Sequence, residues 1–298
     1  MQATSSLQDS SNIQKIEANE LFSLPNFASH VSSKLQDEGY LIISNLKLPS
    51  RCRDQALESL VRLIGEPVLH SPSDKSFILD IKKKVGTTSA VPTYSEHNDE
   101  AFLHTDSAYK EVPEDAFVLY CIKPASCQGG VSTLLSLSDI YDEMALHPRS
   151  NSLIRELESV KYPYLVPSIF KLERDKVNEF VHAPILESSQ NLRFRRDILQ
   201  KGLAKSDTKL DEKAIYAFEW FKSLIENSQK VININLAAGD LLLINNKITL
   251  HGRTAFSDSS RHLLRIRFNF KESVATPSLG DSYSVPESTF LNKFVHEV

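Results

Sequence analysis

Two short histidine motifs in the sequence could bind a metal ion. The stretch "EHNDEAFLHTDSAY" at residues 96–109 contains two copies of His-x-Asp, His97/Asp99 and His104/Asp106. Side chains two residues apart on a β-strand project from the same face, so either pair could offer an imidazole and a carboxylate to one ion. A further ligand must then come from elsewhere in the chain.

His251 is the best third ligand for either motif. A mononuclear non-haem iron site needs two histidines and one carboxylate on one face of the ion, with the opposite face open. In "GDLLLINNKITLHGR" we expect a buried strand, a turn at "NNK" and a returning strand that ends near His251. The glycine that follows could let other groups approach the metal closely.

The two motifs differ in the structure expected around them. His97/Asp99 lies within the polar segment "YSEHNDE", where nothing fixes the direction of the side chains. His104/Asp106 follows the apolar "AFL", and metal ligands need rigid support. We therefore assign His104, Asp106 and His251 as candidate ligands and interpret His97 as a loop or lid residue. Either motif alone carries little weight, because a chain with nine histidines contains such pairs by chance.

Two arginines near the end of the sequence indicate a binding site for an anion. Arg265 follows His251 by fourteen residues, and Arg265 and Arg267 alternate with apolar residues in "RHLLRIRFNF". Both guanidinium groups therefore project from one face of a predicted strand. A guanidinium forms two parallel hydrogen bonds with a carboxylate, which suits the distal end of a dicarboxylate cosubstrate. For Arg267, an exposed strand face is an equally good interpretation.

The overall composition is that of an ordinary globular protein. Of 298 residues, 41% are hydrophobic and 24% charged, and the net charge of −4 gives no basic surface for nucleic acid. We find no apolar run long enough to cross a membrane and no secretory signal. Three cysteines are too few for a disulfide scaffold. We therefore predict a cytoplasmic protein that binds a small molecule, not nucleic acid or membrane, and leave its oligomeric state open.

Periodic patterns predict the elements that must position these residues. Helices are expected at 26–38, 50–67, from Ser138 onward and at 211–228, and strands at 40–46, 117–123, 132–137, 231–236, 240–245 and 262–270. Two more strands, "EFVHAPILE" and "LRFRRDIL", are expected to form a hairpin through "SSQN". Short strands with helices at the start and in one insertion indicate an α+β fold, a double-stranded β-helix (jelly roll) with flanking helices.

We expect one domain. Residues 1–14 are predicted to be a disordered tail and 15–298 a single domain. Within it, 85–100 is a candidate lid loop and 160–228 an insertion with a hairpin and a helix.

The combined motifs resemble the iron(II)/2-oxoglutarate-dependent oxygenases, in particular the taurine dioxygenase and clavaminate synthase-like group. The likeness covers roughly residues 35–272 and rests on "LIGEPV", "FLHTDSAY", "CIKPASCQGGVSTLLSL", "GDLLLINNKITLHGR" and "RHLLRIRF". It implies that His104, Asp106 and His251 bind Fe(II). It also implies that O2 and 2-oxoglutarate are consumed, that succinate and CO2 are released, and that a C–H bond of a small polar metabolite is hydroxylated. Such a metabolite would be amino acid-like or a natural-product intermediate.

The resemblance also assigns residues that bind 2-oxoglutarate. Arg265 would hold the distal carboxylate. A hydroxyl residue after the Gly-Gly pair helps that arginine in the family, and here either Ser132 or Thr133 could do so. Arg261 resembles a second family arginine near the cosubstrate or substrate.

The substrate is less well defined by the sequence. Amino-acid hydroxylases of the clavaminate branch often carry acidic residues on the strand that resembles "LRFRRDIL", where this chain has Arg195 and Arg196. If either arginine faces the site, the substrate bears a carboxylate or another anion; exposed arginines on a strand are an equal interpretation. From the candidate lid, Asn98 and Glu100 could contact the substrate.

Other reactions remain open to the same residues. Related halogenases replace the metal carboxylate with a small residue, so Asp106 argues against halogenation. Desaturation, cyclisation and epoxidation use the same ligands. A catalytically silent jelly-roll binding protein is the alternative from a different class, and the complete set of His104, Asp106, His251 and Arg265 argues against it. The acidic balance argues against a nucleic-acid demethylase.

Overall fold

The computed structural model describes residues 13–70, 75–82, 98–168, 179–187 and 190–271. The predicted tail therefore lies outside the described residues except for its last two positions. Of the candidate lid at 85–100, only residues 98–100 are described.

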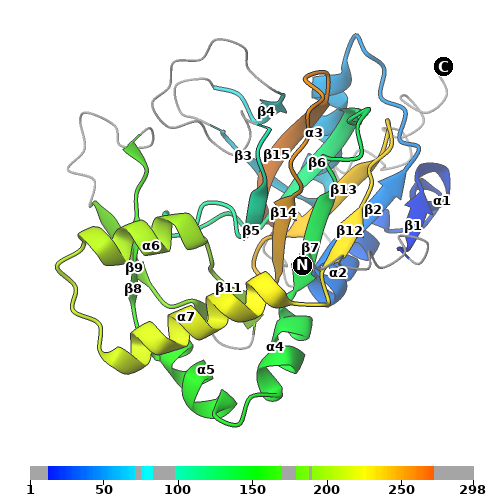
Figure 1. Ribbon diagram of the computed structural model, residues 1–298. Helices are drawn as coiled ribbons and strands as arrows, with labels where there is room; N and C mark the ends of the chain where they lie inside the picture. The colour runs from blue at the N-terminus through cyan, green and yellow to red at the C-terminus, as the bar shows by residue number, and fades with distance from the viewer. Residues whose placement is uncertain (1–12, 71–74, 83–97, 169–178, 188–189, 272–298) are drawn as a thin grey trace, which may run out of the picture.

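Seven strands form the larger of two main sheets (Figure 1). In spatial order they are β1 (Lys15–Glu17), β2 (Tyr40–Ser44), β13 (Leu241–Asn245), β6 (Ala116–Lys123), β15 (His262–Phe270) and β3 (Gly65–Val68), with β4 (Ile78–Ile81) also paired to β15. All pairs are antiparallel except β1 with β2. Strands far apart in sequence thus lie side by side, with β13 next to β6 and β6 next to β15.

A second main sheet of four strands packs against the first. Its order is β12 (Ile232–Ile234), β7 (Ser132–Ser136), β14 (Thr249–Arg253) and β5 (Ala101–His104). The two sheets meet through an apolar cluster contributed by both of them, made of Ile42, Phe117, Leu134, Ile234, Leu242 and Ile244. Residues that alternate with this cluster along the strands face outward, toward the helices.

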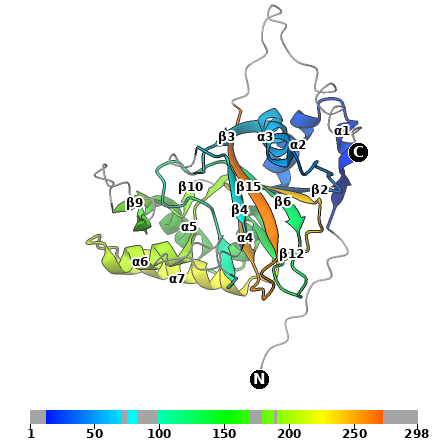
Figure 2. The ribbon, with the colours of Figure 1, turned by 90° about the horizontal axis from the view of Figure 1, so that it is seen from above.

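Three N-terminal helices cover the outer face of the seven-stranded sheet. They are α1 (Ala18–Phe22), α2 (Phe27–Glu38) and α3 (Arg53–Ile64), and Figure 2 shows them together on one side of β2 and β3. The predicted apolar stripe of α2, Phe27, Val31 and Leu35, is almost fully buried, because residues four apart share one helix face.

The other helices pack on the outer face of the four-stranded sheet. They are α4 (Leu137–Ala145), α5 (Ser150–Ser159), α6 (Arg196–Lys205) and α7 (Glu212–Asn227), accompanied by two small hairpins, β8 (Tyr162–Leu165) with β9 (Phe180–Ala183) and β10 (Leu186–Glu187) with β11 (Asn191–Leu192). These helices form a second apolar core with the sheet, to which Leu135 and Leu250 contribute from the strands. The described chain is therefore α+β, and no helix in it is long and apolar enough to cross a membrane.

The predicted strand "LRFRRDIL" is wrong over most of its length. Only Leu192 belongs to a strand, and α6 begins at Arg196. The apparent alternation in "LRFR" gives way to helical spacing, because Ile198 and Leu199 lie one turn after Phe194 and are buried with it. The described part of the insertion consequently holds two helices and two short hairpins.

Candidate metal centre

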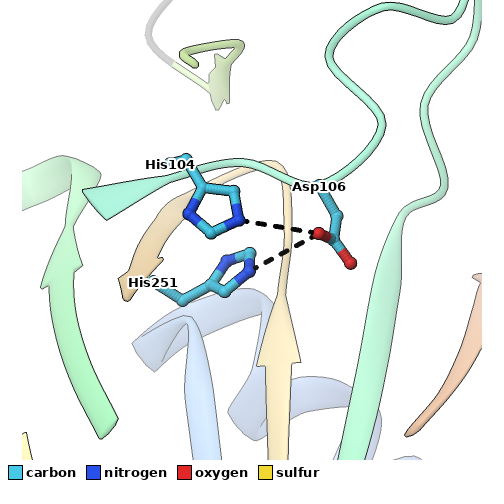
Figure 3. Close-up of side chains that lie close together, drawn as sticks. All are labelled: His104, Asp106 and His251. Carbon is cyan, nitrogen blue, oxygen red and sulfur yellow. Dashed lines mark ion pairs between the residues drawn. The ribbon is translucent and has the colours of Figure 1, made fainter. Parts of the chain in front are cut away.

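The register of one strand pair brings two histidines together. β5 and β14 are antiparallel, and His104 is the direct cross-strand partner of His251. Directly opposite residues project from the same face of a sheet, and the ring centroids of the two imidazoles are 4.3 Å apart. Figure 3 shows both rings directed toward the carboxylate of Asp106.

Asp106 completes a cluster of three metal-binding side chains. Its Oδ1 lies 3.7 Å from Nε2 of His104 and 3.7 Å from Nε2 of His251 (Figure 3). These distances exceed the usual hydrogen-bond range of about 2.7–3.2 Å. All three side chains are buried, and their ligand atoms lie within 4.8 Å of one another. Three donor atoms thus converge on one position at separations longer than ordinary hydrogen bonds.

The charge of Asp106 and the hydrogen bonding of the histidine rings suit these three side chains to binding a cation. Burial alone would raise the pKa of Asp106, but the Arg265 guanidinium and the two imidazoles outweigh burial and hold it well below its usual range. Burial, with His104 nearby, lowers the pKa of His251 to about 4, so this imidazole is neutral. Nδ1 of His104 lies 2.7 Å from the carbonyl oxygen of Phe102 and must donate its hydrogen there. Nε2 of His104 is therefore the ring nitrogen that faces Asp106 and is left for a ligand bond.

This donor set fits a mononuclear non-haem iron centre. Two neutral imidazole nitrogens and one ionised carboxylate oxygen, all on one side, are the ligands that such a centre requires. The neighbouring Oδ2 of Asp106 accepts a hydrogen bond of 2.8 Å from Nη1 of Arg265. One carboxylate oxygen therefore remains for a metal.

Strand register separates the two hydroxyl residues after the Gly-Gly pair. On β7, Leu134 is the partner of His251 and belongs to the cluster between the two sheets. Ser132, two residues away, shares that face, whereas Thr133 projects from the other. A Cβ added to Gly252 would lie 2.7 Å from Oγ1 of Thr133, which places that hydroxyl against the backbone of β14. Ser132 is thus the hydroxyl that faces the space between the sheets.

The two arginines of β15 face the same interior space. Arg265 and Arg267 are paired in register with Leu119 and Phe117 of β6, whose side chains pack between the sheets. Arg267 is buried rather than on an exposed strand face. Its Nη1 donates to Oγ of Ser107 at 2.7 Å and lies 3.3 Å from a carboxylate oxygen of Glu114. Arg265 therefore contacts Asp106 itself, and Arg267 contacts the segment that follows Asp106.

Arg261 is a buried cation without a carboxylate partner in the part of the chain that the structure describes. It is 5% exposed and lies beside the Gly-Gly pair, since a Cβ added to Gly130 would be 3.1 Å from its Nε. Its guanidinium lies 5.2 Å from the ring centroid of Phe256. Burial lowers the pKa of Arg261. Because an unmatched buried charge is costly, this guanidinium is suited to an anionic ligand.

The structure separates the two arginines expected to contact substrate. Burial raises the pKa of Tyr109 to about 12, and the charge of Arg267 and then that of Arg195 act against this rise. Tyr109 follows Asp106 by three residues. Nε of Arg195 donates to Asp197 at 3.1 Å. Arg196 forms an ion pair with Glu226 of α7 and lies over the ring of Phe102.

The described end of the candidate lid runs beside β14. The carbonyl of Asn98 accepts a hydrogen bond of 3.0 Å from the backbone of Phe256, and Glu100 is exposed. Among the described residues, neither side chain forms a hydrogen bond or an ion pair with the metal cluster, and their contact with a substrate stays a prediction.

One polar residue beside the cluster was not singled out from the sequence. Asn246 is hydrogen-bonded to the backbone of Asp106, but in the sequence it is simply part of the turn "NNK". Nothing in that tripeptide distinguishes it from Asn245.

A two-sheet α+β fold with a His-Asp-His cluster between its strands defines a class of mononuclear metal proteins. The chain belongs to the family described as "Taurine catabolism dioxygenase TauD, TfdA family", whose model matches residues 11–267. Glutarate 2-hydroxylase of Salmonella paratyphi B is 27% identical over 173 residues, which cover 56% of this chain and 48% of the relative, and the same enzyme of Salmonella newport matches equally. The chain spans about half the length of the curated relatives it matches.

Solved structures share the fold. Asparagine oxygenase, in complex with Fe(II), 2S,3S-3-hydroxyasparagine and succinate, superposes with a TM-score of 0.62 at 18% identity, over 85% of this chain and 82% of that one. The non-haem iron oxygenase OrfP, in complex with Fe and alpha-ketoglutaric acid, gives a TM-score of 0.60 at 17% identity, over 84% and 82%.

Proposed function

We propose that the protein is an iron(II)- and 2-oxoglutarate-dependent dioxygenase that hydroxylates a C–H bond of a small polar metabolite. The observation that carries this proposal is the convergence of both Nε2 atoms and Oδ1 of Asp106 on one buried position. Membership of the family supports it. We further propose that residues 15–298 form one domain around a double-stranded β-helix, which the two packed sheets support.

His104, Asp106 and His251 would hold the iron. Bound iron and 2-oxoglutarate supply the oxidising power, with O2 as the oxidant and succinate and CO2 as products. The chain's own part is to hold three donors on one side and leave the other side accessible. The apolar residues between the two sheets exclude water from that space, which protects a reactive centre from side reactions.

Arg261 and Ser132 are proposed to bind the distal carboxylate of 2-oxoglutarate. Arg261 is buried beside the Gly-Gly pair, and Ser132 faces the space between the sheets. An apolar cluster that includes Leu263 lies between Arg261 and the metal cluster along β15 and would surround the methylene groups of the cosubstrate. Arg265, the residue first expected in this role, already donates to Asp106 and stays the alternative.

The proposed substrate carries a carboxylate or another anionic group. The resemblance places Arg195 in the segment where amino-acid hydroxylases of the clavaminate branch often carry acidic residues, and its charge acts on Tyr109. The names of two similar proteins, glutarate 2-hydroxylase and asparagine oxygenase, both refer to small carboxylic acids. A desaturation or cyclisation would use the same residues, so the product must decide between these reactions. We also propose a cytoplasmic location, which three free cysteines support.

Metal and cosubstrate binding provide the direct test. Purified protein given Fe(II) and 2-oxoglutarate without oxygen should develop a weak visible absorption band, and His104→Ala should abolish it. His97→Ala is the matched control, because it removes the histidine of the competing motif and should leave the band in place. The opposite pattern would show that His97, and not His104, is the metal ligand.

A panel of small carboxylic acids, scored by succinate release, then tests turnover. A product heavier by one oxygen supports hydroxylation, and a product lighter by two hydrogens supports desaturation. Succinate release that no acid stimulates, together with absence of the visible band, would contradict an oxygenase.

A further inference from the structure

The side chain of Asn246 is hydrogen-bonded to both the N–H and the carbonyl of Asp106. Asn246 follows β13 in the turn that leads to β14 and is 3% exposed. Its Oδ1 accepts the N–H of Asp106 at 2.7 Å. Its Nδ2 donates to the carbonyl of Asp106 at 3.1 Å and to the carbonyl of Glu114 at 2.9 Å. One amide therefore satisfies three backbone groups in the connection between β5 and β6.

Asp106 needs such a partner because it lies beyond the end of its strand. The pairing of β5 with β14 extends only to His104. Ser107 then adopts a left-handed conformation with φ of 56°, so the chain turns away from the ladder immediately after Asp106. A buried peptide group that loses its ladder partner must find another, at a cost of about 1–3 kcal/mol if it does not. The amide of Asn246 takes the place of a peptide group in a neighbouring strand.

The same contact links the two segments that carry the candidate ligands. Asn246 belongs to the turn that connects β13 to β14, five residues before His251. His104 is fixed to β14 by the β5–β14 ladder. Asp106 is outside the ladder, and its backbone is attached to the β13–β14 connection through Asn246. The position of its carboxylate relative to His251 therefore depends on this side chain.

We propose that Asn246 is a positioning residue that fixes Asp106 relative to His251 and thereby sets the affinity of the centre for its metal. The inference rests on the proposed function of the three ligands. Partners that orient metal ligands typically change metal affinity or activity by about 10- to 100-fold when they are removed. We expect an effect of this size for Asn246→Ala.

Asn245 provides a matched control in the same turn. It is 5% exposed, its Nδ2 donates to the carbonyl of Leu35 at 3.1 Å, and its Oδ1 accepts the N–H of Lys247 at 3.0 Å. It has the same chemistry and comparable burial, but its side chain is hydrogen-bonded to Leu35 and Lys247 and not to the segment that carries His104 and Asp106. Asn245→Ala should lower stability while leaving metal affinity within about twofold of the wild type, a difference of about 0.4 kcal/mol.

The experiment measures two quantities for each protein. Affinity is measured by anaerobic titration with Fe(II) and with Co(II), and protection of the Asp106 amide is measured by hydrogen exchange in the metal-free state. Asn246→Ala should weaken metal binding about 10- to 100-fold and accelerate exchange of that amide. Asn246→Asp keeps the acceptor for the Asp106 N–H but loses both donors. It should preserve the protection and still bind metal more weakly than Asn245→Ala.

The outcomes separate this inference from the proposed function. If wild-type protein binds neither ion, the proposed function fails, and the exchange rates still show whether Asn246 fixes Asp106. If the wild type binds metal and Asn246→Ala binds it as tightly as Asn245→Ala does, the inference is overturned. Should Asn246→Ala not fold, Asn246→Asp is judged by the same comparison.

Discussion

Arg265 and Asp106 form a buried ion pair in which only one carboxylate oxygen is used. Nη1 of Arg265 lies 2.8 Å from Oδ2, while Oδ1 faces the imidazoles of His104 and His251. The guanidinium therefore compensates part of the carboxylate's charge and fixes its rotation. A metal held by this cluster would meet a single oxygen of Asp106, which leaves its other positions available for cosubstrate and oxygen.

Breaking this ion pair should destabilise the metal-free protein strongly. Arg265→Met leaves the Asp106 carboxylate buried without its cation, and such a loss typically costs about 3–5 kcal/mol. The double variant Arg265→Met with Asp106→Leu removes both charges and should recover most of that loss. Urea unfolding of the wild type, both single variants and the double variant measures this coupling. Additive losses in the double variant would show that the two groups do not depend on each other.

Substitution of Arg261 should impair binding of 2-oxoglutarate, whereas substitution of Arg265 should impair binding of iron. Arg261→Met should raise the KM for 2-oxoglutarate about 10- to 100-fold, because a hydrogen bond to a charged group contributes about 1.5–3 kcal/mol. The affinity for iron should change little. Arg265→Met should mainly weaken iron binding, because the carboxylate of Asp106 loses its orientation. Anaerobic iron titration and succinate release at saturating iron measure the two effects. The reverse pattern would show that Arg265, and not Arg261, binds the distal carboxylate of 2-oxoglutarate.

The metal-free protein should lose stability between about pH 6.5 and pH 4 because of His251. An unfolded histidine has a pKa of about 6.5, and His251 in the folded chain has a pKa of about 4. In this window the unfolded chain binds the extra proton, so acid favours unfolding, by on the order of 3 kcal/mol in full. Asp106, whose pKa is lowered, loses its stabilising effect only as the pH falls below about 3.9.

His251→Gln should flatten that part of the stability profile. Denaturant unfolding in the presence of a chelator, at intervals from pH 4 to pH 7, gives the comparison with the wild type. Iron added to the wild type should steepen the loss, because it binds the deprotonated imidazoles. An unchanged slope in the variant would mean that His251 is not the group responsible.

Substitution of Arg195 should affect substrate binding, whereas substitution of Arg196 should affect the stability of the fold. Arg195→Ala should raise the KM for the best acid of the substrate panel, because Arg195 is the residue proposed to bind the anionic group of the substrate. Arg196→Ala loses its ion pair with Glu226 and its contact with Phe102, so we expect a small loss of stability with an unchanged KM. Succinate release and thermal unfolding of both variants provide the measurements. Equal effects on KM would contradict this division.

The sequence predicted those features that depend on local periodicity. The helices α2 and α3 and the strand that carries His251 were predicted correctly, because apolar spacing determines them. The His-x-Asp motif does not lie wholly on a strand, since β5 ends at His104 and Asp106 lies beyond it. The convergence of His104, Asp106 and His251 could also be predicted, since ligand types and strand patterns restrict the choices.

Features that depend on register or tertiary contacts could not be predicted. The choice between Ser132 and Thr133 requires knowing which face of β7 points inward. The burial of Arg267 depends on Ser107 and Glu114, which are far from it in sequence. "LRFRRDIL" was misinterpreted because four alternating residues precede a helix whose apolar face appears only afterward.

The direct pairing of His104 with His251 makes the alignment of β5 and β14 a condition for metal binding. A shift of one residue between these strands would turn His104 to the opposite face of the sheet. Such a misaligned chain would keep most of its secondary structure but could no longer hold the ion with both imidazoles. During folding, iron bound by the proposed ligands would therefore favour the correctly aligned strands over compact misfolded states, so the ion would increase the accuracy of assembly.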